Sequence, residues 1–425
     1  MSAMDDDAYH APTKLWQDLD RHSPPGVDAI RRGFRSPLRG PRLTSVLGLV
    51  LLVTLPVVII TGLLDYAAYG PRFGQAYPSH VSWLRLPTFD WPTRPSWLFR
   101  LTQGLHVGLG IVLIPVVLAK LWSVIPKLFA WPPARSVAQV LERISLLLLV
   151  GGILFETATG VLNIQYAYLF GFDFYTAHYF GAWVFIGAFV AHVTLKLPRL
   201  VAALRSRSGP DHLVAASPGP ATLSRRGVLA LVGGGSLLLA LLTVGQSLDG
   251  PLRRTALLLP RGRNPGQGPN GFQVNRSAAA AGIRPSETGA DWRLTLTGGD
   301  RTVRLDRAAL LAMAQHTARL PIACVEGWST MQTWTGVRLA DLGALAGVPE
   351  PASAHVRSLE RDGLFGQATL QSNQVTDRDA LLALRVNGVD LSADHGFPAR
   401  VIVPALPGVH CTKWVASIEF RTGPS

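Results

Sequence analysis

Residues 320–336 read LPIACVEGWSTMQTWTG and hold Cys324, one of only two cysteines in a chain of 425 residues. A free cysteine of this kind often packs as a small buried hydrophobe. Its thiolate is also a soft metal ligand. Two cysteines are too few for a disulfide framework, so their number indicates no redox compartment. Cys324 is therefore a candidate metal ligand, and the residues around it have to decide between the two interpretations.

The chain that precedes this segment is strongly apolar. The mean hydropathy is +0.25 and charged residues make up 16% of the sequence, which is unusual for a soluble protein. The apolar residues are gathered in runs close to the ~20 residues that a helix needs to cross a bilayer. Five such runs are predicted as membrane spans, at about 44–64, 97–122, 141–163, 174–195 and 227–248.

Basic residues predict the orientation of these spans. Seventeen Lys and Arg residues lie before the first span, between the second and third spans or at their facing ends, and between the fourth and fifth spans. The segment between the first and second spans holds Arg72, Arg85 and Arg94, with Arg100 at its edge. Because positively charged loops stay cytoplasmic, we expect the N-terminus inside and everything after the fifth span outside. The net charge of +13 is then mostly a topology signal, with anionic lipid rather than nucleic acid as the partner.

This interpretation divides the chain into five regions. We expect a basic cytoplasmic tail at 1–43, a four-span domain at 44–200, and a cytoplasmic loop with the fifth span at 201–248. A segment rich in Pro, Gly, Arg and Asn follows at 249–271 and is typical of a linker. Residues 272–425 are expected to form an extracytoplasmic domain.

The start of the fifth span resembles a twin-arginine export signal, because Ser224-Arg225-Arg226 precedes a Gly-rich apolar stretch. Two arginines also fit an ordinary positive-inside flank. The export interpretation gains from the domain that follows, since a domain that acquires a complex cofactor in the cytoplasm has to cross the membrane folded. An internal signal of this kind would remain as an anchor.

Three histidines inside the spans are candidate metal ligands. His178 and His192 are fourteen residues apart on the fourth span, so both face one side of the helix at depths that differ by ~21 Å. His106 on the second span lies at a depth similar to that of His178. Two histidines at one level on facing helices are suited to bis-imidazole ligation of a haem. The alternative is that they only hydrogen-bond to the backbone. Glu156 on the third span fits a proton-handling role at a quinone site and a structural role equally well.

Four spans with these histidines resemble the di-haem cytochrome b subunits of bacterial hydrogenases and formate dehydrogenases. The resemblance implies a haem b on His106 and His178. In that family the inner histidine of the fourth span pairs with a histidine on the first span, and the first span here has none. The chain therefore predicts one haem, with a second possible only if His192 has another partner.

The C-terminal region has the sequence pattern of an α+β domain. The run WRLTLTGGDRTVRL (292–305) predicts a hairpin around Gly298-Gly299-Asp300, and HVRSLERDG (355–363) predicts a strand with a turn. The runs RAALLAMAQHTA (307–318) and TDRDALLALRVNG (376–388) are interpreted as helices, and FPARVIVPAL and TKWVASIEF as strands. Short helices mixed with strands in no repeating order indicate α+β architecture.

Against this background, LPIACVEGWSTMQTWTGVRLADL resembles the cofactor segment of the sulfite oxidase family of molybdopterin enzymes. It is most similar to the catalytic subunit of bacterial periplasmic methionine sulfoxide reductases, which have a Cys-Val-Glu-x-Trp-Ser run. The resemblance implies that Cys324 ligates molybdenum and that Glu326 and Trp328 shape the catalytic pocket. An equal alternative is that Glu326 and Trp328 only pack around the metal ligand. The resemblance extends to HGFPARVIVPALPGVHCTKW (395–414), where the family contacts the pterin and its phosphate. The implied cofactor contacts are His395, Arg400, Cys411, Thr412 and Lys413.

Two departures from the family pattern bear on the substrate. Sulfite oxidases and assimilatory nitrate reductases follow the cysteine with an Asn-Arg pair that belongs to an anion pocket, and this chain has Glu326-Gly327-Trp328 instead. The reductase also has a Tyr-Glu pair near the start of the domain, which GFQVNRSAAAAG (271–282) lacks. Asn275 is the candidate cofactor contact in that segment.

The sequence as a whole predicts a multidomain protein with a four-helix haem bundle, a fifth anchor helix and an α+β molybdopterin domain. We expect a bacterial plasma-membrane oxidoreductase in which a quinone pool, haem b and molybdopterin act in series. The expected reaction is reduction of an S- or N-oxide carried by a small molecule or a protein. Oxidation of a sulfite-type donor is one alternative, and a non-catalytic binding module on a haem anchor is the other. The sequence predicts no oligomeric state.

Overall fold

The computed structural model describes residues 36, 38, 41–70, 80–81, 83–85, 88–129, 137–165, 169–205, 220, 222–248, 251–258, 269–361 and 366–423. Most of the predicted cytoplasmic tail and much of the predicted linker lie outside these residues. The chain forms two compact units. The first unit comprises Met1–Pro56, Val112–Ala158 and Phe180–Leu237, and the second comprises Val57–Ile111, Thr159–Tyr179 and Leu238–Ser425. The boundary between the units falls inside long helices. Residues of both units are found in α3 (Pro41–Ala68), α6 (Val137–Ile164) and α7 (Phe174–Arg205).

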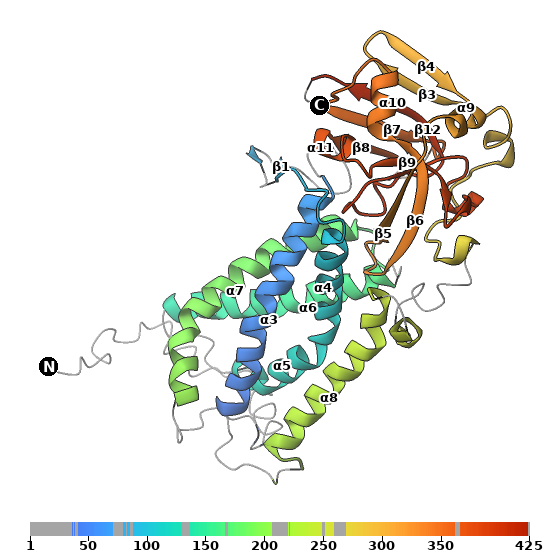
Figure 1. Cartoon of the computed structure of the whole chain (residues 1–425). Helices are drawn as coiled ribbons and strands as arrows, with labels where there is room; N and C mark the ends of the chain where they lie inside the picture. Colours follow the sequence, from blue (N-terminus) through green and yellow to red (C-terminus); the bar gives the residue numbers. More distant parts are fainter. Residues whose placement is uncertain are drawn as a thin grey trace. The chain divides into compact units, whose positions relative to one another are not determined.

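The N-terminal region is made of long apolar helices, labelled in Figure 1. Four of them are long and apolar enough to cross a membrane, at Arg42–Ala68, Gln139–Ile164, Phe174–Pro198 and Arg225–Gln246. Few of their side chains are buried inside the protein, and an apolar surface of this kind is suited to lipid. The helices are α3 (Pro41–Ala68), α4 (Leu98–Val112), α5 (Ile114–Leu128), α6 (Val137–Ile164), α7 (Phe174–Arg205) and α8 (Arg225–Thr243).

The predicted second span is a bent pair of helices rather than one straight helix. Helices α4 and α5 meet at Leu113 with a bend of 42°. Pro115 in the first turn of α5 explains the break, because proline has no N–H to continue the hydrogen bonds of α4 and its ring clashes with the preceding turn. If the pair counts as one span, the described helices supply five candidate spans in total.

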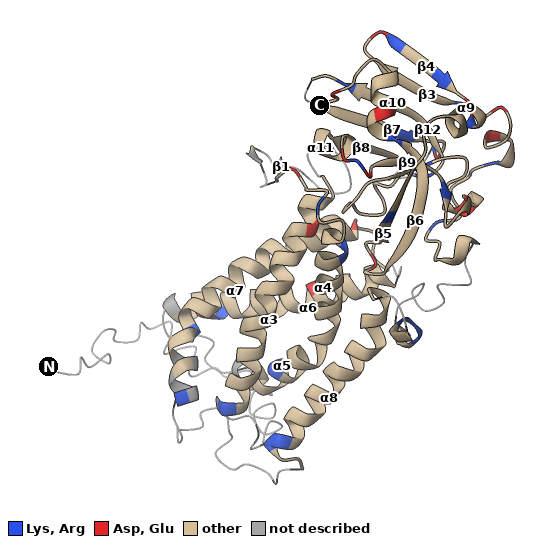
Figure 2. Cartoon of the chain, in the orientation of Figure 1, with Lys and Arg blue, Asp and Glu red and all other residues tan. Residues whose placement is uncertain are grey.

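Basic residues in the first unit gather near particular helix ends. Figure 2 shows Lys and Arg at the first residues of α3 and α8 and toward the last residues of α7, whereas the apolar middles of these helices carry almost no charge. Lys120 of α5 donates a hydrogen bond to the backbone oxygen of Thr44 on α3, and Lys196 of α7 forms an ion pair with Glu142 of α6.

The C-terminal part of the second unit contains two five-stranded sheets and is an α+β domain (Figure 1). The first sheet has the order β10-β9-β6-β5, and β11 also pairs with β9. The second has the order β4-β3-β12-β7-β8, in which β12 and β3 are parallel and all other pairs are antiparallel. The strands of the first sheet are β5 (His316–Ala323), β6 (Ser329–Arg338), β9 (Leu381–Val386), β10 (Val389–Asp390) and β11 (Arg400–Ile402).

The strands of the second sheet are β3 (Leu294–Gly298), β4 (Arg301–Leu305), β7 (Ser353–Ser358), β8 (Gln367–Gln371) and β12 (Val415–Arg421). A separate two-stranded sheet pairs β1 (His80–Val81) with β2 (Leu84–Arg85). Short helices connect the strands, and they are α9 (Arg307–Ala312), α10 (Leu339–Leu345) and α11 (Ser372–Val375). The 3-10 turns are η2 (Val244–Gln246), η3 (Pro251–Thr255), η4 (Pro269–Gly271), η5 (Pro285–Glu287) and η6 (Ala393–His395).

Several predicted elements of this domain are confirmed and one is wrong. The hairpin at 292–305 is β3 and β4, and the predicted strands at 355–363 and 412–420 correspond to β7 and β12. The predicted helix at 307–318 ends at Ala312, and β5 begins at His316. The predicted helix at 376–388 is instead strand β9, which lies between β6 and β11. Its side chains from Leu381 to Leu384 are fully buried, so no polar face marks the period of a strand.

The close pairing of β6 and β9 depends on a glycine. A Cβ on Gly336 would lie 2.0 Å from the backbone oxygen of Leu382, so no other residue fits there without moving β9. The ladder shifts register between Thr335 and Gly336 at the same place. Trp334, the residue before Thr335, is fully buried and packs edge-on against Phe272 with ring centroids 5.8 Å apart. This packing connects the sheet to the segment that carries Asn275.

Candidate active site

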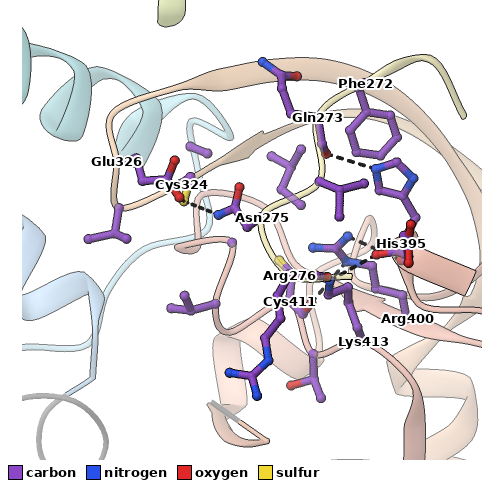
Figure 3. A pocket seen from close by; sticks show the side chains of 18 of the residues that line it. Phe272, Gln273, Asn275, Arg276, Cys324, Glu326, His395, Arg400, Cys411 and Lys413 are labelled. Atoms are coloured by element: carbon purple, nitrogen blue, oxygen red, sulfur yellow. Dashed lines mark hydrogen bonds between the residues drawn. The ribbon is translucent and has the colours of Figure 1, made fainter. Parts of the chain in front are cut away.

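A cavity of about 530 Å³ opens beside the C-terminal end of β5. It brings together every candidate site residue that the sequence analysis placed in the C-terminal domain. Figure 3 shows their side chains arriving from the segment at 272–276, from the turn after β5 and from the region around β11. The predicted residues that line the cavity are Asn275, Cys324, Glu326, Trp328, His395, Arg400, Cys411, Thr412 and Lys413.

Cys324 lies in a tight turn between β5 and β6. Its backbone N–H donates to the oxygen of Trp328 at 2.8 Å, and its own oxygen accepts from the N–H of Gly327 at 3.0 Å. The turn requires Gly327 to adopt φ +90°, a conformation that residues with a side chain rarely take. The side chain of Cys324 is only 3% exposed, and Asn275 Nδ2 donates to its sulfur at 2.6 Å (Figure 3).

Glu326 lies beside Cys324 and is nearly inaccessible, with 1% of its surface exposed. Its Oε1 is 3.5 Å from Cys324 Sγ, and its Oε2 accepts a hydrogen bond from Trp328 Nε1 at 3.2 Å. Burial raises the pKa of the Glu326 carboxyl to about 8, while the hydrogen bond from Trp328 opposes the shift. The group next to Cys324 is thus a buried carboxyl.

Arg400, the first residue of β11, is a buried cation at the opposite side of the cavity from Glu326 (Figure 3). Only 5% of it is exposed. Its Nε donates to the backbone oxygen of Cys411 at 3.1 Å, and its Nη1 donates to that of His395 at 3.4 Å. Burial lowers the pKa of Arg400 to about 10, and the two cysteines of the cavity oppose this shift. The guanidinium is therefore held in place by neutral acceptors only.

Lys413 supplies a second cation. Its ammonium donates to the backbone oxygens of Arg276 and Asp394, the latter at 3.0 Å, and lies 4.3 Å from the centre of the Trp414 ring. Burial lowers the pKa of Lys413 to about 7, and the positive charge of Arg400 adds to the shift. Among the described residues, neither Lys413 nor Arg400 forms an ion pair with a carboxylate. Lys413 is only half-buried, and the charges of Glu360 and Asp394 partly offset the lowering of its pKa. A buried guanidinium and a half-buried ammonium on one cavity favour an anionic ligand.

His395 is bonded to protein groups through both ring nitrogens. Its Nε2 is 3.1 Å from the backbone oxygen of Gln273, and its Nδ1 is 3.2 Å from the hydroxyl of Ser392. Burial lowers the pKa of His395 to about 3, and Arg400 contributes to the shift, so the imidazole is neutral. Asn270 Oδ1 also lies 3.1 Å from Nδ1, so both ring nitrogens face an oxygen that can accept a hydrogen bond. The ring also stacks on Phe272 at 3.7 Å between centroids, so His395 holds the segment at 272–276 against the cavity.

Polar groups on the cavity wall remain for a ligand. Thr412 Oγ1 and both side-chain amide atoms of Gln273 are buried and have no hydrogen-bond partner within the described part of the chain. Buried polar atoms normally have partners, so unpaired ones around a cavity indicate a polar ligand. A soft thiolate, two cations, unpaired amide and hydroxyl groups and apolar walls fit a pterin that carries a phosphate and a thiolate-ligated metal.

Sequence reasoning missed several residues of this wall. Gln273 and Arg276 flank the predicted Asn275, and Arg276 forms an ion pair with Glu360 at 2.8 Å. Tyr175, at the beginning of α7, also lines the cavity. A signal for Gln273 and Arg276 was available, because both belong to the GFQVNR run that was singled out for Asn275. Nothing in the sequence indicates Tyr175, which is near only in the folded chain.

The structure also brings His106 of α4 and His178 of α7 together, with ring centroids 6.1 Å apart and ring planes at 89°. His106 Nδ1 is 3.0 Å from the backbone oxygen of Val58, and His178 Nδ1 is 2.9 Å from the hydroxyl of Thr159. A Cβ on Gly62 would lie 2.7 Å from the His106 ring, so this glycine makes room for the imidazole.

His192 of α7 and Glu156 of α6 lie in the first unit. The described residues contain no group of three or more His, Cys, Asp and Glu side chains that fits a metal ion. Glu156 of α6 packs against Gly181 of α7, where a Cβ would lie 2.3 Å from its Oε1.

Comparison with known proteins assigns the domain that forms the cavity. Residues 281–425 match the family model of the oxidoreductase molybdopterin-binding domain. Sulfite oxidase of Arabidopsis thaliana is 37% identical over 100 residues, covering 20% of this chain and 25% of that protein. The uncharacterized oxidoreductase YuiH of Bacillus subtilis is 33% identical over 132 residues, covering 30% of this chain and 65% of that protein.

A match to a solved structure is more distant. The sulfane dehydrogenase SoxCD of Paracoccus pantotrophus has 25% sequence identity and a TM-score of 0.29, over 32% of this chain and 39% of the matched chain. The chain spans a quarter to just under two thirds of the length of the two curated relatives above.

Proposed function

The C-terminal domain is a molybdopterin-binding oxidoreductase domain of the sulfite oxidase family, and we propose that the whole chain is a membrane-bound reductase of S- or N-oxides. In this proposal a quinone pool donates electrons, a haem b on the helices carries them, and the cavity around Cys324 is the site of reduction. The observation that carries the proposal is the convergence of a buried thiol, Arg400 and Lys413 on one cavity.

The residues of the cavity have separate tasks toward the cofactor. Cys324 is placed to ligate molybdenum through its sulfur, with Asn275 donating to the same atom. Arg400 and Lys413 supply positive charge for the pterin phosphate, and the unpaired groups of Thr412 and Gln273 supply further hydrogen bonds. When bound, the cofactor supplies two-electron oxygen-atom transfer. The protein binds it, orients it and keeps most of it away from water.

The surroundings of Cys324 favour a neutral oxide over an anion as substrate. The turn after Cys324 contributes Val325, the buried Glu326 and Trp328 to the cavity, and none of these attracts an oxyanion. A carboxyl group in particular repels sulfite or nitrate when it is charged and offers only one hydrogen when it is not. A sulfoxide or N-oxide carries no net charge, so it pays no such penalty in this cavity.

His106 and His178 fit the proposed haem. Their imidazole rings come from two different helices and lie 6.1 Å apart between centroids, so the two residues would hold one haem iron. Bonding of Nδ1 to a protein acceptor is the usual way to orient a histidine that ligates through Nε2. A second haem on His192 is a weaker proposal, because the first predicted span, at 44–64, holds no histidine to pair with it.

Membrane insertion completes the proposal. The four apolar helices and the bent pair would cross a bacterial plasma membrane, with the basic helix ends in the cytoplasm and anionic lipid around them. The molybdopterin domain would then lie on the extracytoplasmic side. Arg225 and Arg226 at the start of α8 would serve as the twin-arginine signal for its export in folded form.

A second candidate reaction runs in the opposite direction. The similarity to sulfite oxidases favours oxidation of a sulfite-type donor, with electrons flowing from the cavity into the membrane. Optical spectra of the haem separate the two reactions. We expect dithionite-reduced protein, freed of excess dithionite, to be reoxidised by methionine sulfoxide or trimethylamine N-oxide and not by buffer alone. Reduction of the oxidised haem by sulfite, with no reoxidation by either oxide, would establish the sulfite-type reaction instead.

A further inference from the structure

The turn that carries Cys324 is attached to α4, the helix that carries His106. Gln103 of α4 donates a hydrogen bond from its side-chain amide to the backbone oxygen of Val325, the residue after Cys324. The next turn of α4 also touches the loop, because a Cβ on Gly327 would lie 2.9 Å from the Val107 side chain. Both contacts lie inside the second compact unit. Gln103 and Val107 are one helical turn apart, and His106 lies between them in the sequence.

Further hydrogen bonds hold the same turn in place. Ser247 Oγ donates to the backbone oxygen of Gly327 at 2.6 Å, and Arg100 of α4 donates to the backbone oxygen of Ser247 at 2.6 and 2.9 Å. Arg253 donates to the backbone oxygen of Ser329. Because Gln103, Gly327 and Arg253 are all buried or enclosed at this contact, the separation between Cys324 and α4 is fixed by packing and not by a mobile linker.

Helix α7, which carries His178, also brings a residue to the cavity shortly before its histidine. Tyr175 lines the cavity and precedes His178 by three residues on α7. Gln103 precedes His106 by three residues on α4. Each histidine helix therefore places a residue at the cavity, or at the loop that forms it, one turn before its histidine.

We propose that the hydrogen bond from Gln103 to Val325 is the main bridge for electron transfer between the His106–His178 pair and Cys324. The inference rests on the proposed function, since it needs a haem at the first site and molybdenum at the second. The path consists of less than one turn of α4, the Gln103 side chain, one hydrogen bond and one residue of backbone. Gln103 is a positioning residue in this scheme, because it touches neither reacting centre.

Electrons cross this bridge one at a time. Each crossing would take one electron from a ferrous haem and deliver it to the molybdenum site. Two crossings, with two protons, convert one sulfoxide or N-oxide to the sulfide or amine and water. A quinol supplies both electrons and releases two protons as it becomes the quinone, so the reaction balances.

The variant Gln103→Met tests the bridge in the full-length, detergent-solubilised protein. Methionine keeps the length and apolar packing of the side chain and removes the donor. We expect reoxidation of the reduced haem by methionine sulfoxide, followed by stopped-flow absorbance, to be about 10–100-fold slower, the range found when outer partners of metal sites are removed. The haem spectrum, its midpoint potential, the molybdenum content and oxide reduction by a reduced viologen dye are expected to match the unaltered protein.

Ser247→Ala is the matched control, because it removes one hydrogen bond to the same loop and leaves Gln103 with Val325. It should reoxidise its haem at nearly the unaltered rate, and Gln103→Leu repeats the test if the methionine variant does not fold. An unchanged rate in Gln103→Met would overturn the inference, and so would an equal loss of viologen-dependent activity, which would assign Gln103 to the cavity itself. A wild-type protein without haem absorbance would contradict the proposed function instead.

Discussion

At the scale of single residues, the sequence located the cavity well. Nine residues separated by up to 138 positions, from Asn275 to Lys413, line one cavity, although their roles stay predictions. Short runs with defined spacing made this possible, since Cys324, Glu326 and Trp328 share one turn and the 395–413 segment wraps the other side. Gln273 and Tyr175 were not predicted because their importance comes from neighbours that are far away in the sequence.

The buried guanidinium of Arg400 should control cofactor binding. Replacing Arg400 with Met removes a charge-assisted contact worth about 1.5–3 kcal/mol, so we expect cofactor affinity to fall by about 10–100-fold. Arg385→Met is the control, because its guanidinium is half exposed and paired with Asp390 on the surface, where such pairs contribute little. Molybdenum per chain after purification is the measurement. Equal molybdenum in both variants would rule out Arg400 as a cofactor contact.

Lys413 should make the stability of the cofactor-free protein depend on pH. Its pKa in the folded state is about 7, below the value of 10.5 for an exposed lysine. Between these values the unfolded chain binds more protons than the folded one, so stability rises as pH increases from 7 to about 10. We expect the apparent Tm of protein made without cofactor to rise from pH 7 to pH 9. Lys413→Met should flatten that rise, and an equal rise in both proteins would contradict this account of Lys413.

At the scale of elements, hairpins and amphipathic strands were predictable and the central strand was not. The hairpin of β3 and β4 has a Gly-Gly-Asp turn and alternating side chains, which are local signals. Strand β9 is paired on both edges and buried on both faces, so its sequence shows a continuous apolar run that also fits a helix. Tertiary burial decided its structure, and no local pattern carried that information.

The turn after Cys324 should tolerate no side chain at Gly327. A Cβ there would meet Gln246 at 2.8 Å and Val107 at 2.9 Å, in addition to the strain of φ +90°. Gly388 is the matched control, because it has φ +83° and open space around its Cβ position. We expect Gly388→Ala to cost about 1 kcal/mol of unfolding free energy, and Gly327→Ala to cost more, by about 1–3 kcal/mol for the overpacking. Similar losses in chemical denaturation would show that the loop does not press on α4.

At the scale of the whole molecule, the sequence predicted an apolar helical region followed by an α+β oxidoreductase domain, and both are present. The bend between α4 and α5 was not predicted, because one proline in a long apolar run is compatible with a kinked or a broken span. The boundary of the compact units was also not predicted. Contacts such as Gln103 with Val325 join helix α4 to the C-terminal part of the second unit, and sequence periodicity holds no information about them.

Topology can be tested at the same scale. Alkaline phosphatase is active only outside the cytoplasm, so we expect activity when it is fused after Ser425 and none when it is fused in the segment at 206–219 between α7 and α8. The physical reason is the excess of Lys and Arg before the first span and around that segment. Activity at 206–219, or its absence after Ser425, would contradict the proposed orientation.

The central claim is that the cavity around Cys324 holds a molybdenum cofactor. The most direct test is the molybdenum and iron content of the purified, detergent-solubilised protein, compared with its Cys324→Ala variant, from a host that makes the cofactor. The account predicts about one molybdenum and one haem iron per chain, with molybdenum lost and iron retained in the variant. Iron without molybdenum in the unaltered protein, or equal molybdenum in the variant, would contradict it.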